Sequence, residues 1–140
     1  MKKSLFLFLV LFFVGASSCK KDQYKDIPNV YVNLYLNINS TLYMELNNVG
    51  GWVNITGGYQ GILVYRESTD LFMAYERTCP YDPDVSGAMI VVDTSGLTMS
   101  DGICGSRYLI LDGSVVNGPA TLPLKQYRTE FDGNTLHIYN

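Results

Sequence analysis

Two thiols and two carboxylates in the middle of the chain could together bind a metal ion. Cys79 and Asp82 lie in one turn-rich segment, and Asp101 and Cys104 lie in another. The spacing Asp101-x-x-Cys104 is that of a two-ligand knuckle, and an S₂O₂ set could hold zinc or mononuclear iron. However, aspartate is also expected in turns for backbone reasons, and two cysteines without histidine make a poor closed site. We therefore predict no metal here and keep metal binding as the alternative.

Catalytic chemistry has little support in the sequence. The only histidine, His137, lies in a predicted strand far along the chain from both segments and is interpreted as an ordinary strand residue. Neither a Gly-x-Ser-x-Gly elbow nor a His-Glu-x-x-His motif occurs. The neighbouring carboxylates Asp82 and Asp84 are better explained as solvated turn residues. We predict that the protein is not an enzyme.

The first residues have the order of an export signal. Lys2 and Lys3 precede an apolar run over residues 5–14, too short to span a bilayer, and small residues follow directly before Cys19. This order resembles a bacterial lipoprotein signal, which implies cleavage after residue 18 and acylation of Cys19. Residues 19–29 are polar and predict a flexible lipidated tether, similar to that of surface lipoproteins of the Bacteroidetes group. We expect a bacterial cell-envelope location, lipid-anchored, on the periplasmic or exposed side of the outer membrane.

Composition favours one all-β domain over residues 30–140. The chain has 140 residues, with 11 tyrosines and 13 glycines, which suit short strands and tight turns. Its formal net charge is −3 and no basic stripe is present, which argues against nucleic acid as a partner.

The alternation of polar and apolar side chains predicts the strands that must position the thiols. Residues 30–38 and 52–56 alternate polar and apolar side chains, and the second run stops at Gly57-Gly58, a hairpin-type turn. Residues 42–46 could form either a strand or a helical turn, and the sequence does not decide between the two. About nine short strands are expected, in an antiparallel sandwich or small barrel. Residues 115–120 are expected to cross over the end of the sheet.

Two loop motifs, with their order and spacing, resemble those of Rieske iron–sulfur proteins. Cys79-Pro80-Tyr81 resembles the first cluster-holding loop, and the run from Asp101 to Tyr108, with Gly105-Ser106, resembles the second. The segments that lead into the loops and close the domain are similar as well, namely residues 74–80, 112–120, 123–127 and 132–136. The resemblance implies a Rieske-like fold over nearly the whole domain.

The same resemblance shows that the ligands of the family's cofactor are not retained at the matching positions. It places the four ligand positions at Cys79, Tyr81, Asp101 and Cys104, where the family has two cysteines and two histidines around a [2Fe–2S] cluster. Only Cys79 matches in type, so these positions are interpreted as vestigial. No cofactor is expected.

The resulting prediction is a cluster-free, non-catalytic binding or structural module with an unknown protein or glycan partner. If the loops pack as in the family, Cys79 and Cys104 face each other and could form a disulfide in an oxidising compartment. Two separate buried thiols are the other possibility. The alternative function is a redox or metal-binding protein with an altered ligand set around Cys79 and Cys104.

Overall fold

The structure is a computed structural model that describes Tyr24 and residues 26–140. The predicted signal over residues 1–18 and Cys19 lie outside the described residues. Of the predicted tether, Ile27 is buried, and the Tyr24 hydroxyl donates a hydrogen bond to the Leu124 carbonyl at 3.2 Å. No helix in the described part of the chain is long and apolar enough to cross a bilayer.

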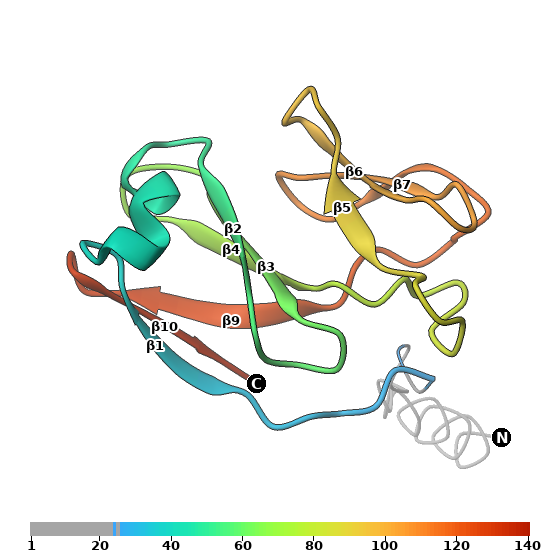
Figure 1. The fold of residues 1–140 in the computed structure, drawn as a ribbon, viewed down its shortest axis with the longest axis horizontal. Helices are drawn as coiled ribbons and strands as arrows, with labels where there is room; N and C mark the ends of the chain where they lie inside the picture. Colours follow the sequence, from blue (N-terminus) through green and yellow to red (C-terminus); the bar gives the residue numbers. More distant parts are fainter. Residues whose placement is uncertain (1–23, 25) are drawn as a thin grey trace, which may run out of the picture.

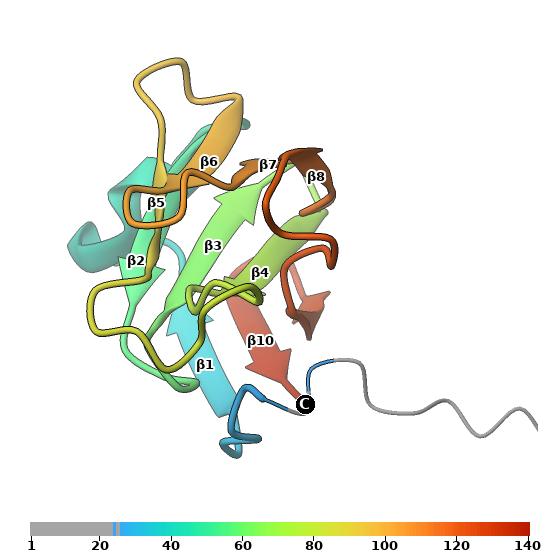
Figure 2. The same ribbon diagram turned by 90° about the vertical axis from the view of Figure 1, so that its right-hand side faces the viewer.

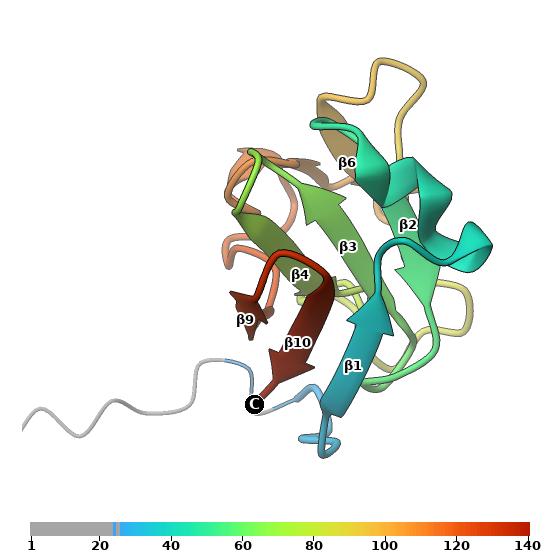
Figure 3. The ribbon, with the colours of Figure 1, turned by 90° about the vertical axis from the view of Figure 1, so that its left-hand side faces the viewer.

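Six strands form the larger sheet. Its antiparallel order is β1-β10-β9-β4-β3-β2, which is easiest to follow in Figure 3. The strands are β1 (Asn33–Asn37), β2 (Trp52–Ile55), β3 (Ile62–Arg66), β4 (Phe72–Glu76), β9 (Gln126–Phe131) and β10 (Thr135–Tyr139).

Four strands form a smaller antiparallel sheet between β4 and β9 in the chain. Its order is β5-β6-β7-β8, and Figures 1 and 2 show it on one side of the larger sheet. The strands are β5 (Ile90–Val92), β6 (Thr98–Asp101), β7 (Arg107–Leu109) and β8 (Val115–Asn117). All the candidate metal ligands therefore lie in this insertion and its loops.

The central strands β3 and β4 are buried on both faces. In β3, Ile62 and Val64 belong to a core formed with β1, β9 and β10, whereas Leu63 and Tyr65 belong to a second core under the smaller sheet. Successive strand side chains point to opposite faces, so one strand serves two cores. This explains why the β3 sequence is continuously apolar.

The predicted all-β fold is confirmed, with ten described strands in two antiparallel sheets. The segment left open between strand and helix is a 3₁₀ helix, η1 (Thr41–Asn47), which buries Leu46. The Ser40 side chain caps it by accepting from the Leu42 amide. Residues 115–117, which the sequence predicted as part of a crossover, form the edge strand β8 instead.

Candidate metal centre

Two loops meet at the edge of the smaller sheet and carry the candidate ligands. The first loop follows β4, and an isolated bridge between Thr78 and Met89 closes it. The second loop connects β6 to β7, and hydrogen bonds from Asp101 N to Ser106 O and from Gly105 N to Asp101 O tighten it. Each loop is thus fixed by its own backbone bonds, which places its side chains without help from a ligand.

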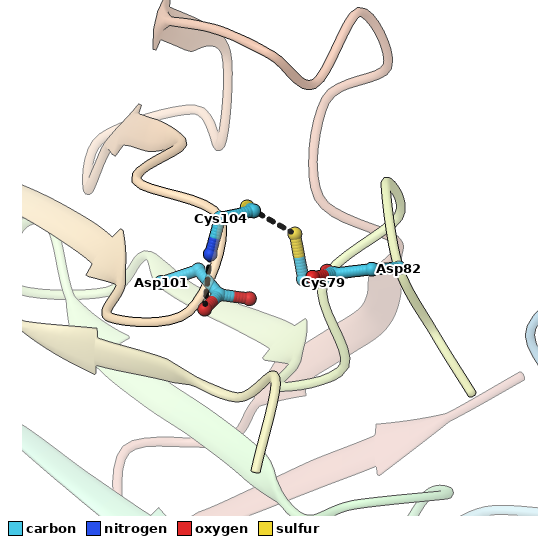
Figure 4. Close-up of side chains that lie close together, drawn as sticks. All are labelled: Cys79, Asp82, Asp101 and Cys104. Carbon is cyan, nitrogen blue, oxygen red and sulfur yellow. Dashed lines mark hydrogen bonds between the residues drawn. The ribbon is translucent and has the colours of Figure 1, made fainter. Parts of the chain in front are cut away.

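Cys79, Asp82, Asp101 and Cys104 converge between these loops. One ligand atom from each residue lies within 4.8 Å of all the others. The Cys79 and Cys104 sulfurs are 3.7 Å apart as two free thiols, and a dashed line in Figure 4 marks this contact.

The two thiols differ in exposure. Cys79 is 0% exposed, and its sulfur lies 3.4 Å from the Tyr108 hydroxyl. Burial raises the pKa of the Cys79 thiol to about 12. Cys104 is half-buried; its sulfur lies 3.0 Å from the Ser106 hydroxyl and accepts from the Ser106 amide at 3.4 Å. Solvent therefore reaches the pair from the Cys104 side.

The two carboxylates are incompletely hydrogen-bonded. Asp101 is 1% exposed; its Oδ1 accepts from the Ile103 amide at 2.6 Å and the Cys104 amide at 3.4 Å, but its Oδ2 has no partner. Asp82 Oδ1 is likewise buried without a partner. These are the two unpartnered buried side-chain atoms found in the described part of the chain. A buried carboxylate oxygen without a partner is costly, unless something else binds it.

The spacing of the sulfurs matches that of a metal-bound pair, and it is also that of two thiols in hydrogen-bonding contact. Two metal–sulfur bonds of about 2.3 Å at a tetrahedral angle hold their sulfurs about 3.8 Å apart. The observed distance is 3.7 Å. With one oxygen from each aspartate facing the sulfurs, the site offers four donors of the kinds that zinc accepts.

The structure brings some of the predicted site residues together and leaves another exposed. Cys79, Asp101 and Cys104 come together, whereas Tyr81 is 56% exposed. Asp82 takes the fourth place, although the sequence pointed to it only in the alternative. Cys79-x-x-Asp82 mirrors Asp101-x-x-Cys104, and that repeated spacing is the signal that could have found it.

His137 lies in the larger sheet, outside the cluster. Its ring stacks on Tyr35 with centroids 4.2 Å apart and on Tyr139 with centroids 4.5 Å apart. Its Nε2 lies 2.7 Å from Asn33 Oδ1. The interpretation of His137 as a strand residue agrees with these contacts.

A buried carboxylate supports the start of the first loop. Glu76, at the end of β4, accepts from the amides of Tyr59, Gln60 and Thr78, and from the hydroxyls of Thr78 and Tyr127. Burial alone would raise the pKa of Glu76, but these donors favour the charged form and bring the pKa below its usual value. Glu76 therefore joins the end of β4, where the first loop begins, to the loop between β2 and β3 and to strand β9.

Comparison with known proteins finds similarity only in structure. No family profile and no curated protein sequence matches the chain. One solved structure, a complex of reduced oxygenase and oxidized ferredoxin in carbazole 1,9a-dioxygenase, aligns at 20% identity with a TM-score of 0.46, over 65% of this chain and 90% of that one. A second, a complex of ferredoxin with a single-residue variant of the oxygenase of carbazole 1,9a-dioxygenase, aligns at 15% identity with a TM-score of 0.50. It covers 84% of this chain and 31% of that chain.

The fold is Rieske-like. The second alignment covers most of this chain, 84% of its length. This chain spans about a third of the length of that neighbour, so the likeness bears on the domain architecture alone.

The donors in the loops do not fit a Rieske cluster. Such a cluster takes two imidazoles on one iron, and the four side chains gathered here include none. Carboxylates in their place are hard oxygen donors that suit an iron–sulfide cluster poorly.

Proposed function

We propose that the protein is a non-catalytic metal-binding module that holds one transition-metal ion between the two loops. The ligands are Cys79, Asp82, Asp101 and Cys104. One observation carries the proposal: four donor atoms, one from each side chain, lie within 4.8 Å of one another, the two sulfurs are 3.7 Å apart, and each aspartate has a buried oxygen without a partner. An ion at this point would bind all four atoms and remove the cost of leaving the oxygens unpaired.

The donor set favours zinc or iron(II). Thiolates select against magnesium and calcium, and carboxylates select against copper(I). Four protein donors fill a tetrahedral shell, so no position is left for substrate or water, as in structural zinc sites. The ion would act by joining the loops, since the nearby chain offers no other chemistry.

Metal analysis of the full chain, purified reduced and without oxygen, tests the proposal. We expect close to one equivalent of zinc or iron per chain. A Cys104→Ser variant is expected to lose the metal, whereas Tyr81→Phe, a change at the exposed position between two ligands, retains it. Less than about a tenth of an equivalent in the reduced wild-type protein, after incubation with excess zinc and dialysis, contradicts the proposal.

A second candidate function is a metal-free binding module whose loops are tied by a Cys79–Cys104 disulfide. The 3.7 Å separation of the sulfurs favours it, because only a modest approach is needed for an oxidant of the exported compartment to take two electrons and two protons from the thiols and join them. Closing this loop would stabilise the domain by roughly 3 kcal/mol. Peptide mapping without reductant is the test: recovery of both cysteines as alkylatable thiols in metal-free protein excludes this candidate.

The cellular setting remains as the sequence suggests. We propose that Cys19 is acylated after export and anchors the domain at the bacterial cell envelope, with an unknown protein or glycan as its partner and no nucleic acid. Support comes from the residue order of the leader and the acidic charge balance. Replacing Cys19 by alanine should move the protein from the membrane fraction to the soluble fraction; unchanged fractionation would contradict acylation.

A further inference from the structure

The metal site contains two thiols with unequal access. Cys79 is fully buried beside Tyr108, and Cys104 is half-buried. A reagent from solution therefore meets Cys104 first. This asymmetry decides what an oxidant can do at the site, whichever ion the loops hold.

We infer that Cys104 is the entry thiol and Cys79 the resolving thiol of an oxidation that expels the metal ion. The oxidant is a small-molecule disulfide. The inference rests on the proposed metal site and names how that site would be regulated: binding of the ion and the protein disulfide exclude each other, because both need the same two sulfurs.

The reaction proceeds in two exchanges. The Cys104 thiolate attacks one sulfur of the small disulfide, forms a mixed disulfide and releases one small thiolate. The Cys79 thiolate, 3.7 Å away, then attacks the Cys104 sulfur and releases the second small thiolate. Two electrons pass from the two protein thiolates to the small disulfide. The divalent ion leaves with no sulfur ligand, and two small thiolates balance its charge.

The surroundings of Cys104 suit the first step. The Ser106 amide and hydroxyl both lie within hydrogen-bonding distance of its sulfur, and the Ala120 amide donates to the same hydroxyl. These groups hold the Cys104 sulfur on the side of the site that solvent reaches. Cys79 has a hydroxyl neighbour but no exposed surface, so it can act only on a partner already inside the site.

Oxidised glutathione is the probe for the test. The reduced full chain is loaded with zinc, and its metal content is measured before any oxidant is added. On addition of oxidised glutathione, we expect a chelating dye to detect zinc release in step with formation of the Cys79–Cys104 disulfide. Cys79→Ser should accumulate one glutathionyl group on Cys104, whereas Cys104→Ser should react at least tenfold more slowly.

The outcomes separate the inference from the proposed function. Equal reaction rates of the two variants overturn the inference and leave the metal site standing. Zinc that stays bound after the disulfide has formed is held elsewhere on the chain, and this result removes both the inference and the proposed site. A reduced protein that binds no zinc fails at the first measurement and removes both. If a variant does not fold, peptide mapping of wild-type protein at early times replaces it: glutathione on Cys104 supports the order, and glutathione on Cys79 overturns it.

Discussion

At the scale of single residues, Asp101 has two separable roles. One carboxylate oxygen closes a turn by accepting from the Ile103 and Cys104 amides, and the other faces the cluster without a partner. The sequence kept metal binding by this aspartate as an alternative and explained it first by the turn. That explanation is correct for Oδ1, but it leaves Oδ2 unaccounted for.

An Asp101→Asn substitution separates these roles. The amide oxygen can keep the turn, while the NH₂ group replaces the oxygen that faces the sulfurs and cannot bind a cation. We expect zinc affinity to fall on the order of 100-fold, since even loss of a partner that only orients a ligand costs about 10–100-fold. Competition with a chelator measures the affinity, and circular dichroism checks that the fold is kept. Unchanged affinity in a folded variant would remove Asp101 from the ligand set.

Glu76 gives a residue-scale prediction on stability. In Glu76→Gln, an NH₂ group faces donors that the carboxylate accepted, so we expect a loss of about 2–4 kcal/mol in unfolding free energy at pH 7. The pKa of Glu76 in the folded protein lies below its ordinary value of 4.5. Its contribution is therefore present above that pH and is lost as the pH falls through the folded pKa.

The difference between wild type and Glu76→Gln should accordingly shrink as the pH falls below about 4.5. Denaturant unfolding at several pH values measures it. Other carboxylates with lowered pKa values, such as Asp93 and Asp132, are common to both proteins and cancel in the difference. A difference independent of pH would show that Glu76 acts through packing rather than through its charge.

At the scale of elements, the β2–β3 loop is built around Glu76. Gly58 has φ +62°, and a Cβ there would contact the Glu76 carboxylate and lie 2.6 Å from the Tyr127 hydroxyl. Gly96 has φ +70° and open space around it. We expect Gly58→Ala to destabilise the protein by at least about 2 kcal/mol more than Gly96→Ala, because the left-handed backbone cost is shared and only the clash differs. Thermal unfolding of both variants compares them; equal losses would show that the loop can move away.

The strands and the 3₁₀ helix also show how much of the fold could be predicted from the sequence. Alternating segments and turn pairs predicted the strands and their hairpins, because period-two patterning reports a face directly. The 3₁₀ helix stayed open, since seven residues carry too little periodicity. Strand β8 was missed, because Val115–Asn117 is half-exposed to exposed and has only three residues. In the site, all four members were named as a possible metal-ligand set, but their convergence could not be predicted, because side-chain direction in a turn cannot be obtained from spacing.

At the scale of the whole molecule, the second of the two cores joins the smaller sheet to the larger one. Tyr75 in β4 donates a buried hydrogen bond to the Ile110 carbonyl beyond β7, and Leu63 and Tyr65 of β3 pack in the same core. Both metal loops emerge from this junction. The distance between the two loops therefore depends on the packing of the two sheets. A ligand that joins the loops should stabilise the entire domain.

Zinc should consequently raise the unfolding temperature of the whole protein. A ligand that binds only the folded state at about 100 times its dissociation constant adds about 2.7 kcal/mol, or a rise of roughly 10 °C for a domain of this size. Scanning calorimetry of reduced full chain with and without zinc measures the shift, and a single transition is expected because the sheets share one core. Asp101→Asn should show little shift at the same zinc concentration, and protein oxidised at Cys79 and Cys104 should show none. A shift of equal size in all three proteins would place the zinc elsewhere on the chain.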